Sequence, residues 1–198
     1  MDRMEQARAR ILTAAARRFA EGGFAGAQMA EIARDAGMGV GTLYKHFPSK
    51  EALYRAMVHR FLSRLFEATE PALDAAGGSL AEALRAYARA TVVCVAEDPL
   101  VCRAVARETL GSRVVFRSVI GPDDWERIQA HRARVAGVFS AHHRELGGSI
   151  SPEDAAVFFL GTLWSFVEHD LNRDAPEAIR ERADLAVRLV LRGVEGGP

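Results

Sequence analysis

A compact set of polar side chains follows three closely spaced glycines in the segment AGMGVGTLYKHFPSKE, residues 36–51. Their hydroxyl, phenol, ammonium and imidazole groups all form hydrogen bonds with phosphate oxygens or with the edges of nucleic-acid bases. Small residues directly before the set allow the backbone to approach a binding surface closely. The pattern therefore predicts a surface that binds a polyanion through Thr42, Tyr44, Lys45, His46 and Lys50.

Two short helices joined by a sharp turn are predicted around this set. Apolar positions favour a helix over about 28–36, which Gly37 ends. A further helix over about 39–47 stops where a proline follows, because the residue before a proline resists the α conformation. Leu43 and Phe47 lie four positions apart and would anchor this helix on its neighbours. The pair is a helix-turn-helix candidate, whose second helix fits the DNA major groove, about 12 Å wide.

Helical periodicity continues along almost the whole chain, whereas strand signals are nearly absent. Gly22-Gly23 ends the first helix, and serine N-caps at 49, 79 and 151 begin three others. An irregular stretch is expected between 111 and 122. We therefore expect an all-α fold of about nine helices. Besides the two short ones, their expected ranges are 5–21, 49–71, 79–97, 99–110, 123–146, 151–172 and 176–196.

Charge is unevenly distributed along a chain whose formal net charge is zero. Residues 1–60 hold ten Lys/Arg and six Asp/Glu, so their net charge is about +4. Residues 61–198 hold sixteen Lys/Arg and twenty Asp/Glu, so their net charge is about −4. A basic head on an acidic body favours contact between the head and a polyanion. The balanced total argues against a protein coated with positive charge throughout.

Cysteine usage and hydropathy predict a reduced, cytoplasmic protein. Cys94 and Cys102 lie in apolar surroundings typical of buried thiols, with a disulfide as the alternative. The charged N-terminus lacks the apolar stretch of a signal peptide. The most apolar run, Val157 to Val167, spans 11 residues and is too short to cross a membrane. We expect no membrane contact.

The usual motifs of catalysis and metal binding do not occur in the sequence. It has no nucleophile elbow and no HExxH motif. GMGVG does not suit a phosphate-binding loop, because no strand precedes it and no GK[ST] follows. His131, His142 and His143 near Glu145 could suggest a metal site, but adjacent histidines on a helix point about 100° apart. We expect no enzyme activity, no catalytic residue, no metal and no cofactor.

The segment ILTAAARRFAEGGFAGAQMAEIARDAGMGVGTLYKHFPSKEAL, residues 11–53, resembles the DNA-binding domain of the TetR (tetracycline repressor-like) family of bacterial transcription regulators. GTLYKHFPSKE is its most specific part, and the resemblance covers about a quarter of the chain. It implies a three-helix helix-turn-helix DNA-binding domain over 1–50. It further implies a helical ligand-binding and dimerisation domain over 51–198, and a regulator that is most commonly a repressor.

The resemblance implies phosphate contacts and base contacts in the short third helix and at its borders. Where many members have a hydroxyl residue, this chain has Ala27-Gln28, so Gln28 must cap its helix or contact DNA through its amide. Where a serine and a basic residue are common, it has Gly39-Val40; Val40 would touch a thymine methyl or extend the Leu43 face inward. Phosphate contacts are implied at Thr42, Tyr44, His46 and Lys50, and base contacts at Val40, Gly41 and Lys45. The predicted DNA-binding residues are Gln28, Gly39, Val40, Gly41, Thr42, Tyr44, Lys45, His46 and Lys50.

A homodimer is expected on physical grounds, because two heads that read half-sites about 34–36 Å apart bind a palindromic operator more tightly than one. The last two helices are the predicted interface. The first of them is apolar nearly all round between Val157 and Val167, which favours burial against both its own core and a partner. Two such pairs would form a four-helix bundle. The alternative is that these stripes fill the core of a single chain.

The resemblance also implies an unknown small-molecule effector that releases the DNA on binding in the helical body. Such an effector must bind one conformation more tightly than the other. For the aromatic candidates, core packing is the competing interpretation, and for the arginines a solvated helix face. The candidate ligand-binding residues are Tyr87, Cys94, Arg103, Arg107, Phe139, Phe159, Trp164, Glu168 and His169. An enzyme and a helical interaction module without a DNA role are the alternative functions.

Overall fold

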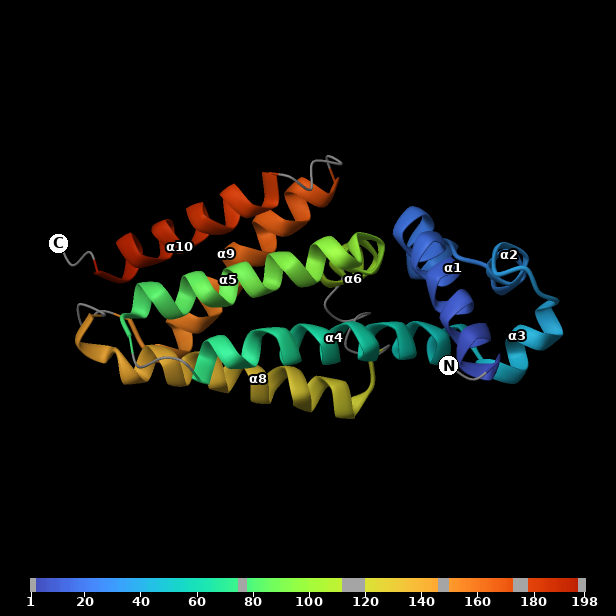
Figure 1. Ribbon diagram of the computed structural model, residues 1–198, viewed down its shortest axis with the longest axis horizontal. Helices are drawn as coiled ribbons and strands as arrows, with labels where there is room; N and C mark the ends of the chain where they lie inside the picture. The colour runs from blue at the N-terminus through green and yellow to red at the C-terminus, as the bar shows by residue number, and fades with distance from the viewer. Residues whose placement is uncertain (1–2, 75–77, 112–119, 146–149, 173–177, 196–198) are drawn as a thin grey trace. The chain divides into compact units, whose positions relative to one another are not determined.

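The computed structural model is all-helical over the residues that it describes, which are 3–74, 78–111, 120–145, 150–172 and 178–195 (Figure 1). Within these ranges it has nine α-helices, one short 3-10 helix and no strand, which confirms the predicted fold class. Most of the irregular stretch predicted between 111 and 122 lies outside the described residues. The helices are α1 Arg3–Gly26, α2 Met29–Asp35, α3 Val40–His46, α4 Lys50–Asp74, α5 Leu80–Glu97, α6 Pro99–Gly111, α8 Pro122–Ala141, η1 His143–Glu145, α9 Pro152–Asn172 and α10 Ala178–Glu195.

Serine side chains begin three of these helices, as the sequence predicts. The hydroxyls of Ser49 and Ser151 each accept a hydrogen bond from the amide three residues later, at 3.1 and 3.0 Å. At the start of α5, the Ser79 hydroxyl accepts from the Glu82 amide at 3.3 Å, and the Glu82 carboxylate accepts from the Ser79 amide at 3.0 Å. These bonds satisfy amides that a helix leaves unpaired at its N-terminus.

The prediction that a helix extends from 123 to 146 is wrong at its C-terminal end, because α8 stops at Ala141. The amide of His142 is shared between the carbonyls of Val138 and Phe139, at 3.3 and 3.2 Å, and this tightening leads into η1. The two ring nitrogens of His142 lie 2.9 Å from the carbonyl oxygens of Val138 and Gly78. A side chain that bonds the backbone of another segment therefore ends the helix where its apolar pattern alone would continue.

The chain divides into two compact units. The first comprises residues 1–62 and 98–125, and the second comprises 63–97 and 126–198. Helices α4 and α8 each contribute residues to both units, and only Asp98 separates α5 of the second unit from α6 of the first. The predicted domains 1–50 and 51–198 remain a prediction, and the compact first unit also takes in α6.

Three aromatic rings pack against one another in the first unit. The ring centroids of Phe19 and Tyr54 lie 5.0 Å apart in an edge-to-face arrangement, and Phe24 lies 5.4 Å from Tyr54. Phe19 and Tyr54 are fully buried. Burial raises the pKa of the Tyr54 phenol, so the ring stays uncharged. This cluster joins α1 to α4 and fixes the frame on which the shorter helices pack.

The C-terminal end of α1 is held by α6, which packs along it. Gly23 has φ +68°, which breaks the helical path where the sequence predicts a stop, and one further turn follows to Gly26. The Glu108 carboxylate accepts a hydrogen bond from the Phe24 amide at 2.8 Å. The Arg107 guanidinium donates to the carbonyl of Glu21 at 3.2 Å. Two side chains of α6 thus satisfy backbone groups at this break.

Replacing Gly23 with alanine should destabilise the protein by about 1–2 kcal/mol, because φ +68° is costly for any residue with a Cβ atom. The new Cβ would also lie 3.1 Å from the Glu108 carboxylate oxygen. Gly26→Ala is the matched control, since a Cβ there meets no atom within 4 Å. Urea unfolding of both variants checks this, and equal midpoints would contradict it.

The second unit contains a buried polar pair within an aromatic core. Helix α10 packs along α9 and against α5 (Figure 1). The Tyr87 hydroxyl lies 2.9 Å from the His131 Nε2 atom. The His131 ring stacks on Phe66 with centroids 4.1 Å apart, and Phe159 lies edge-to-face with Tyr87 at 5.5 Å. The side chain of His131 is therefore enclosed by rings and is 6% exposed.

Burial lowers the pKa of His131 to about 4, because the apolar surroundings disfavour the charged imidazolium. In the unfolded chain the pKa of a histidine is about 6.5. Between pH 4 and 6.5 the unfolded state therefore binds more protons than the folded state. It follows that His131 makes the folded state less stable as the pH falls through this window.

We expect the free energy of unfolding to contain a His131 contribution that falls by about 3 kcal/mol between pH 7.5 and pH 4. His131→Gln should remove this contribution, because glutamine does not titrate. The exposed His143→Gln is the control and should keep the wild-type pH dependence. Urea unfolding across the pH range measures it, and parallel curves for wild type and His131→Gln would contradict it.

Candidate nucleic-acid interface

The turn between α2 and α3 is a left-handed helix cap centred on Gly37. This residue has φ +68°. Its amide donates to the Arg34 carbonyl at 3.0 Å, and the Met38 amide donates to the Ala33 carbonyl at 3.0 Å. These two bonds are the Schellman arrangement, which glycine favours because it has no Cβ. The cap ends α2 sharply and sends the chain into α3, which confirms the predicted helix-turn-helix.

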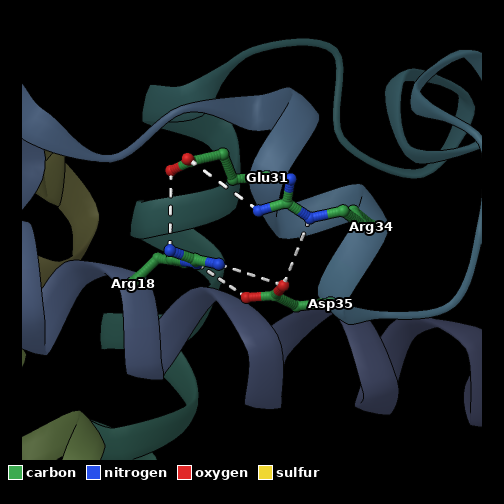
Figure 2. Close-up of polar contacts among 4 residues, drawn as sticks. All are labelled: Arg18, Glu31, Arg34 and Asp35. Atoms are coloured by element: carbon green, nitrogen blue, oxygen red, sulfur yellow. Dashed lines mark hydrogen bonds and ion pairs between the residues drawn. The ribbon is translucent and has the colours of Figure 1, made fainter.

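Helix α2 is tied to α1 by a network of ion pairs (Figure 2). The Arg18 guanidinium binds Asp35 with two hydrogen bonds, at 2.6 and 3.0 Å, and lies 3.6 Å from Glu31. Arg34 lies near both acids, at 4.0 and 3.9 Å. The hydrogen bond from Arg18 holds the pKa of Asp35 below its usual value. The network fixes the orientation of α2 on α1 and compensates the two acids next to the predicted DNA-binding residues.

Helix α3 divides into a buried side and an exposed side. Leu43 and Phe47 are buried, as predicted. Tyr44 and Val40 are 47% and 43% exposed, and Thr42 and Lys45 are exposed as well. One short helix therefore presents a phenol, a hydroxyl, an ammonium and an apolar group to solvent. These groups suit phosphate oxygens, base edges and thymine methyls.

The exposure of Val40 decides between its two interpretations in favour of an outward position. Gly39 is the N-cap of α3 and Gly41 lies in its first turn, and both are exposed. Gln28 is the N-cap of α2, but its side chain makes no capping hydrogen bond. Gln28 is exposed, and its contact with DNA stays a prediction.

The two remaining predicted residues also serve the fold. The Arg8 guanidinium donates to the His46 carbonyl at 3.3 Å, which places a cation at the C-terminal end of α3. The Lys50 ammonium donates to the carbonyls of Ala25 and Ala27 at 3.2 and 3.1 Å and lies 4.8 Å above the Phe24 ring. The sequence predicted Lys50 only as a phosphate contact. Its bonds to these carbonyls were missed because the carbonyls lie more than twenty residues earlier in the sequence.

The candidate ligand-binding residues fall into three groups. Tyr87, Phe139 and Phe159 come together in the second unit, with Phe139 and Phe159 centroids 6.3 Å apart. Arg103 and Arg107 lie on α6 in the first unit, where Arg107 bonds the end of α1. The others are the buried thiol Cys94 on α5, and Trp164, Glu168 and His169 on α9, of which His169 is exposed.

Sequence reasoning missed His131 as the hydrogen-bond partner of Tyr87 and Phe66 as the ring that stacks on His131. The signal for His131 was present, because it lies on the same stripe of α8 as the buried Val135, Val138 and Phe139. The predicted burial of Cys94 and Cys102 is confirmed. Within the described ranges, no group of three or more His, Cys, Asp or Glu residues could hold a metal ion. Among the described helices, none has both the length and the hydropathy needed to span a bilayer.

Comparison with known proteins connects this geometry to one family. Residues 11–57 match the family model for bacterial regulatory proteins of the tetR family. The chain is 45% identical over 67 residues to the HTH-type transcriptional regulator UidR of Escherichia coli K12. This match covers 32% of this chain and 34% of UidR. It is 49% identical over 63 residues to an uncharacterised HTH-type regulator of Mycobacterium tuberculosis. The matched segment spans about a third of the length of these relatives.

Solved structures share the fold along nearly the whole chain. The fatty acid degradation regulator FadR of Bacillus halodurans has a TM-score of 0.77 at 19% identity and covers 96% of this chain and 97% of its own. SmeT, the repressor of a multidrug efflux pump of Stenotrophomonas maltophilia, has a TM-score of 0.65 at 21% identity. Its match covers 94% of this chain and 89% of SmeT. The helix-turn-helix geometry and the family match agree that residues 11–57 belong with the tetR family of bacterial regulatory proteins, and the solved structures add a shared fold along the remaining chain.

Proposed function

We propose that this protein is a transcriptional regulator that binds a palindromic operator as a dimer, acts as a repressor in the cytoplasm, and is released by a small molecule. The observation that carries the DNA-binding role is the exposed side of α3. It presents Tyr44, Thr42 and Lys45 outward, while Leu43 and Phe47 fix the helix from behind. The excess of four positive charges in residues 1–60 favours the same polyanionic partner.

The test of DNA binding uses the fragment upstream of the protein's own gene in a gel shift. We expect the purified protein to retard this fragment and to lose affinity steeply as salt rises. A protein that does not retard it at low salt would contradict the proposal and would favour the helical interaction module.

Lys45→Ala should weaken binding to the same fragment about tenfold and lower the salt slope by about one, because one cation no longer displaces a counterion. The matched control is Arg89→Ala, which removes an equal charge from an exposed position on α5. Fluorescence anisotropy at several salt concentrations measures both quantities. Equal slopes for the two variants would remove Lys45 from the interface.

Support for dimerisation through the last two helices comes from an exposed apolar patch. Val157, Phe158 and Leu189 are exposed large apolar side chains on α9 and α10. Phe158 is 46% exposed and lies against Gly193 of α10, where an added Cβ would meet its ring at 3.4 Å. The patch therefore continues across both helices. Covering it with a second copy would remove apolar area from water and place two α3 helices on one duplex.

Phe158→Glu should weaken the dimer at least a hundredfold, because it would bury a carboxylate without a partner at the proposed interface. Val93→Glu is the control, since Val93 is 54% exposed on α5, outside the patch. Sedimentation velocity across a dilution series gives the dissociation constants. If Phe158→Glu stays dimeric at the same concentrations as the control, the interface lies elsewhere.

Responsiveness to an effector is supported by the fold and by the interior of the second unit. FadR of Bacillus subtilis, solved with stearoyl-CoA, has a TM-score of 0.77 at 20% identity and covers 94% of this chain and 98% of its own. The second unit of this chain encloses aromatic rings together with a buried polar pair. An effector that couples to operator binding by about 1–3 kcal/mol would change the affinity roughly 5–150-fold.

A further inference from the structure

The C-terminal end of α3 is not capped by the turn that follows it. Phe47 leaves the helix in an extended conformation, and its amide donates to the Leu43 carbonyl at 2.9 Å. The next donor of a helix cap normally comes from the residue after it, but here that residue is Pro48, which has no N–H. By contrast, two amides of the following turn close the end of α2. Donors for the last carbonyls of α3 therefore have to come from water or from another part of the chain.

Arg8 of α1 supplies such a donor. Its Nη1 atom donates to the carbonyl of His46, the last residue of α3, at 3.3 Å, and its Cζ atom lies 4.4 Å from the centroid of the Phe47 ring. The N-terminal part of α1 therefore lies beside the end of α3 (Figure 1). A guanidinium in this position interacts favourably with the negative end of the helix dipole and with the face of the ring. One side chain thus binds both the end of α3 and the buried ring that follows it.

Helix α3 depends on contacts of this kind because it has only seven residues. A helix of that length does not hold its shape in water on its own. Leu43 and Phe47 bury one side of it, whereas Tyr44 and Lys45 are exposed. Helix ends fray readily, and the last turn of α3 carries these two exposed residues. Arg8 binds that turn.

We propose that Arg8 is a positioning residue for DNA recognition, which acts by holding the last turn of α3 and not through a phosphate contact of its own. This inference rests on the DNA-binding function proposed above and gives α1 a part in it. Contacts with base edges require the helix to present its side chains in fixed directions, whereas non-specific attraction to phosphates requires mainly positive charge. Loss of Arg8 should therefore reduce the preference for a specific sequence more than the affinity for DNA in general.

Amide hydrogen exchange of the full-length protein tests the capping role without DNA. Arg8→Met keeps an unbranched side chain but loses the cation and the donor. The amides of residues 44–47 should exchange about three- to tenfold faster in this variant than in wild type, with a smaller change in α2. Arg10→Met is the matched control, because it removes an equal charge from an exposed position on the same helix. Equal exchange of residues 44–47 in the two variants would overturn the proposal.

Fluorescence anisotropy tests the effect on recognition with two probes. One is the fragment upstream of the protein's own gene, and the other is a shuffled fragment of the same length and base composition. We expect Arg8→Met to bind the upstream fragment about three- to tenfold more weakly than Arg10→Met does, with equal affinities and equal salt slopes on the shuffled fragment. Weaker binding of both fragments with a lower salt slope would make Arg8 a direct phosphate contact and overturn the proposal. Faster exchange with an unchanged preference would overturn it as well.

Arg8→Lys separates the positioning role from a general effect on folding. Lysine keeps a cation and N–H donors at the end of a long side chain, so it should restore most of the exchange protection and most of the preference for the upstream fragment. If lysine behaves like methionine at this position, the assignment is wrong. A wild-type protein that does not distinguish the two fragments would contradict the proposed DNA-binding function instead, and the exchange experiment would still decide whether Arg8 caps α3.

Discussion

Unpaired backbone groups at the end of α1 are the constraint on which the first unit depends. A helix leaves its last carbonyls without intrahelical hydrogen-bond partners. The break at Gly23 also leaves the Phe24 amide without a partner in the helix. Arg107 donates to the Glu21 carbonyl and Lys50 to the Ala25 carbonyl, and Glu108 supplies an acceptor for the Phe24 amide. Three side chains from two other helices thus converge on one helix end. The position of α1 is set there.

The position of α1 determines that of α3 in two steps. Arg18 fixes α2 through Asp35, and the cap at Gly37 then fixes the direction in which α3 leaves α2. Leu43 and Phe47 complete the placement by burial. Because each step depends on the previous one, a change at the end of α1 would alter how α3 is presented. Helix α6 supplies two of the side chains that bind the end of α1. In the sequence, only Asp98 lies between α6 and α5.

Much of this architecture could be predicted from the sequence, because local signals determine it. The serine caps, the break at Gly23 and the turn at Gly37 each depend on residues within a few positions of each other. The end of α8 could not be predicted, since His142 bonds the carbonyl of Gly78, far away in the sequence. The site shows the same division. The exposed side of α3 follows from its period, whereas the partners of Arg107 and of His131 depend on tertiary packing.

Lys50 illustrates why a residue's position in a family motif does not show whether it contacts DNA or stabilises the fold. Its ammonium has three donors, and two of them bond the carbonyls of Ala25 and Ala27. Replacing it would remove these bonds, so weaker DNA binding by such a variant would not distinguish a lost phosphate contact from a displaced α1. Lys45 is exposed on α3, and its charge can be removed with less effect on the frame. The proposed DNA-binding surface is therefore better tested at Lys45 than at Lys50, which also bonds the backbone at the end of α1.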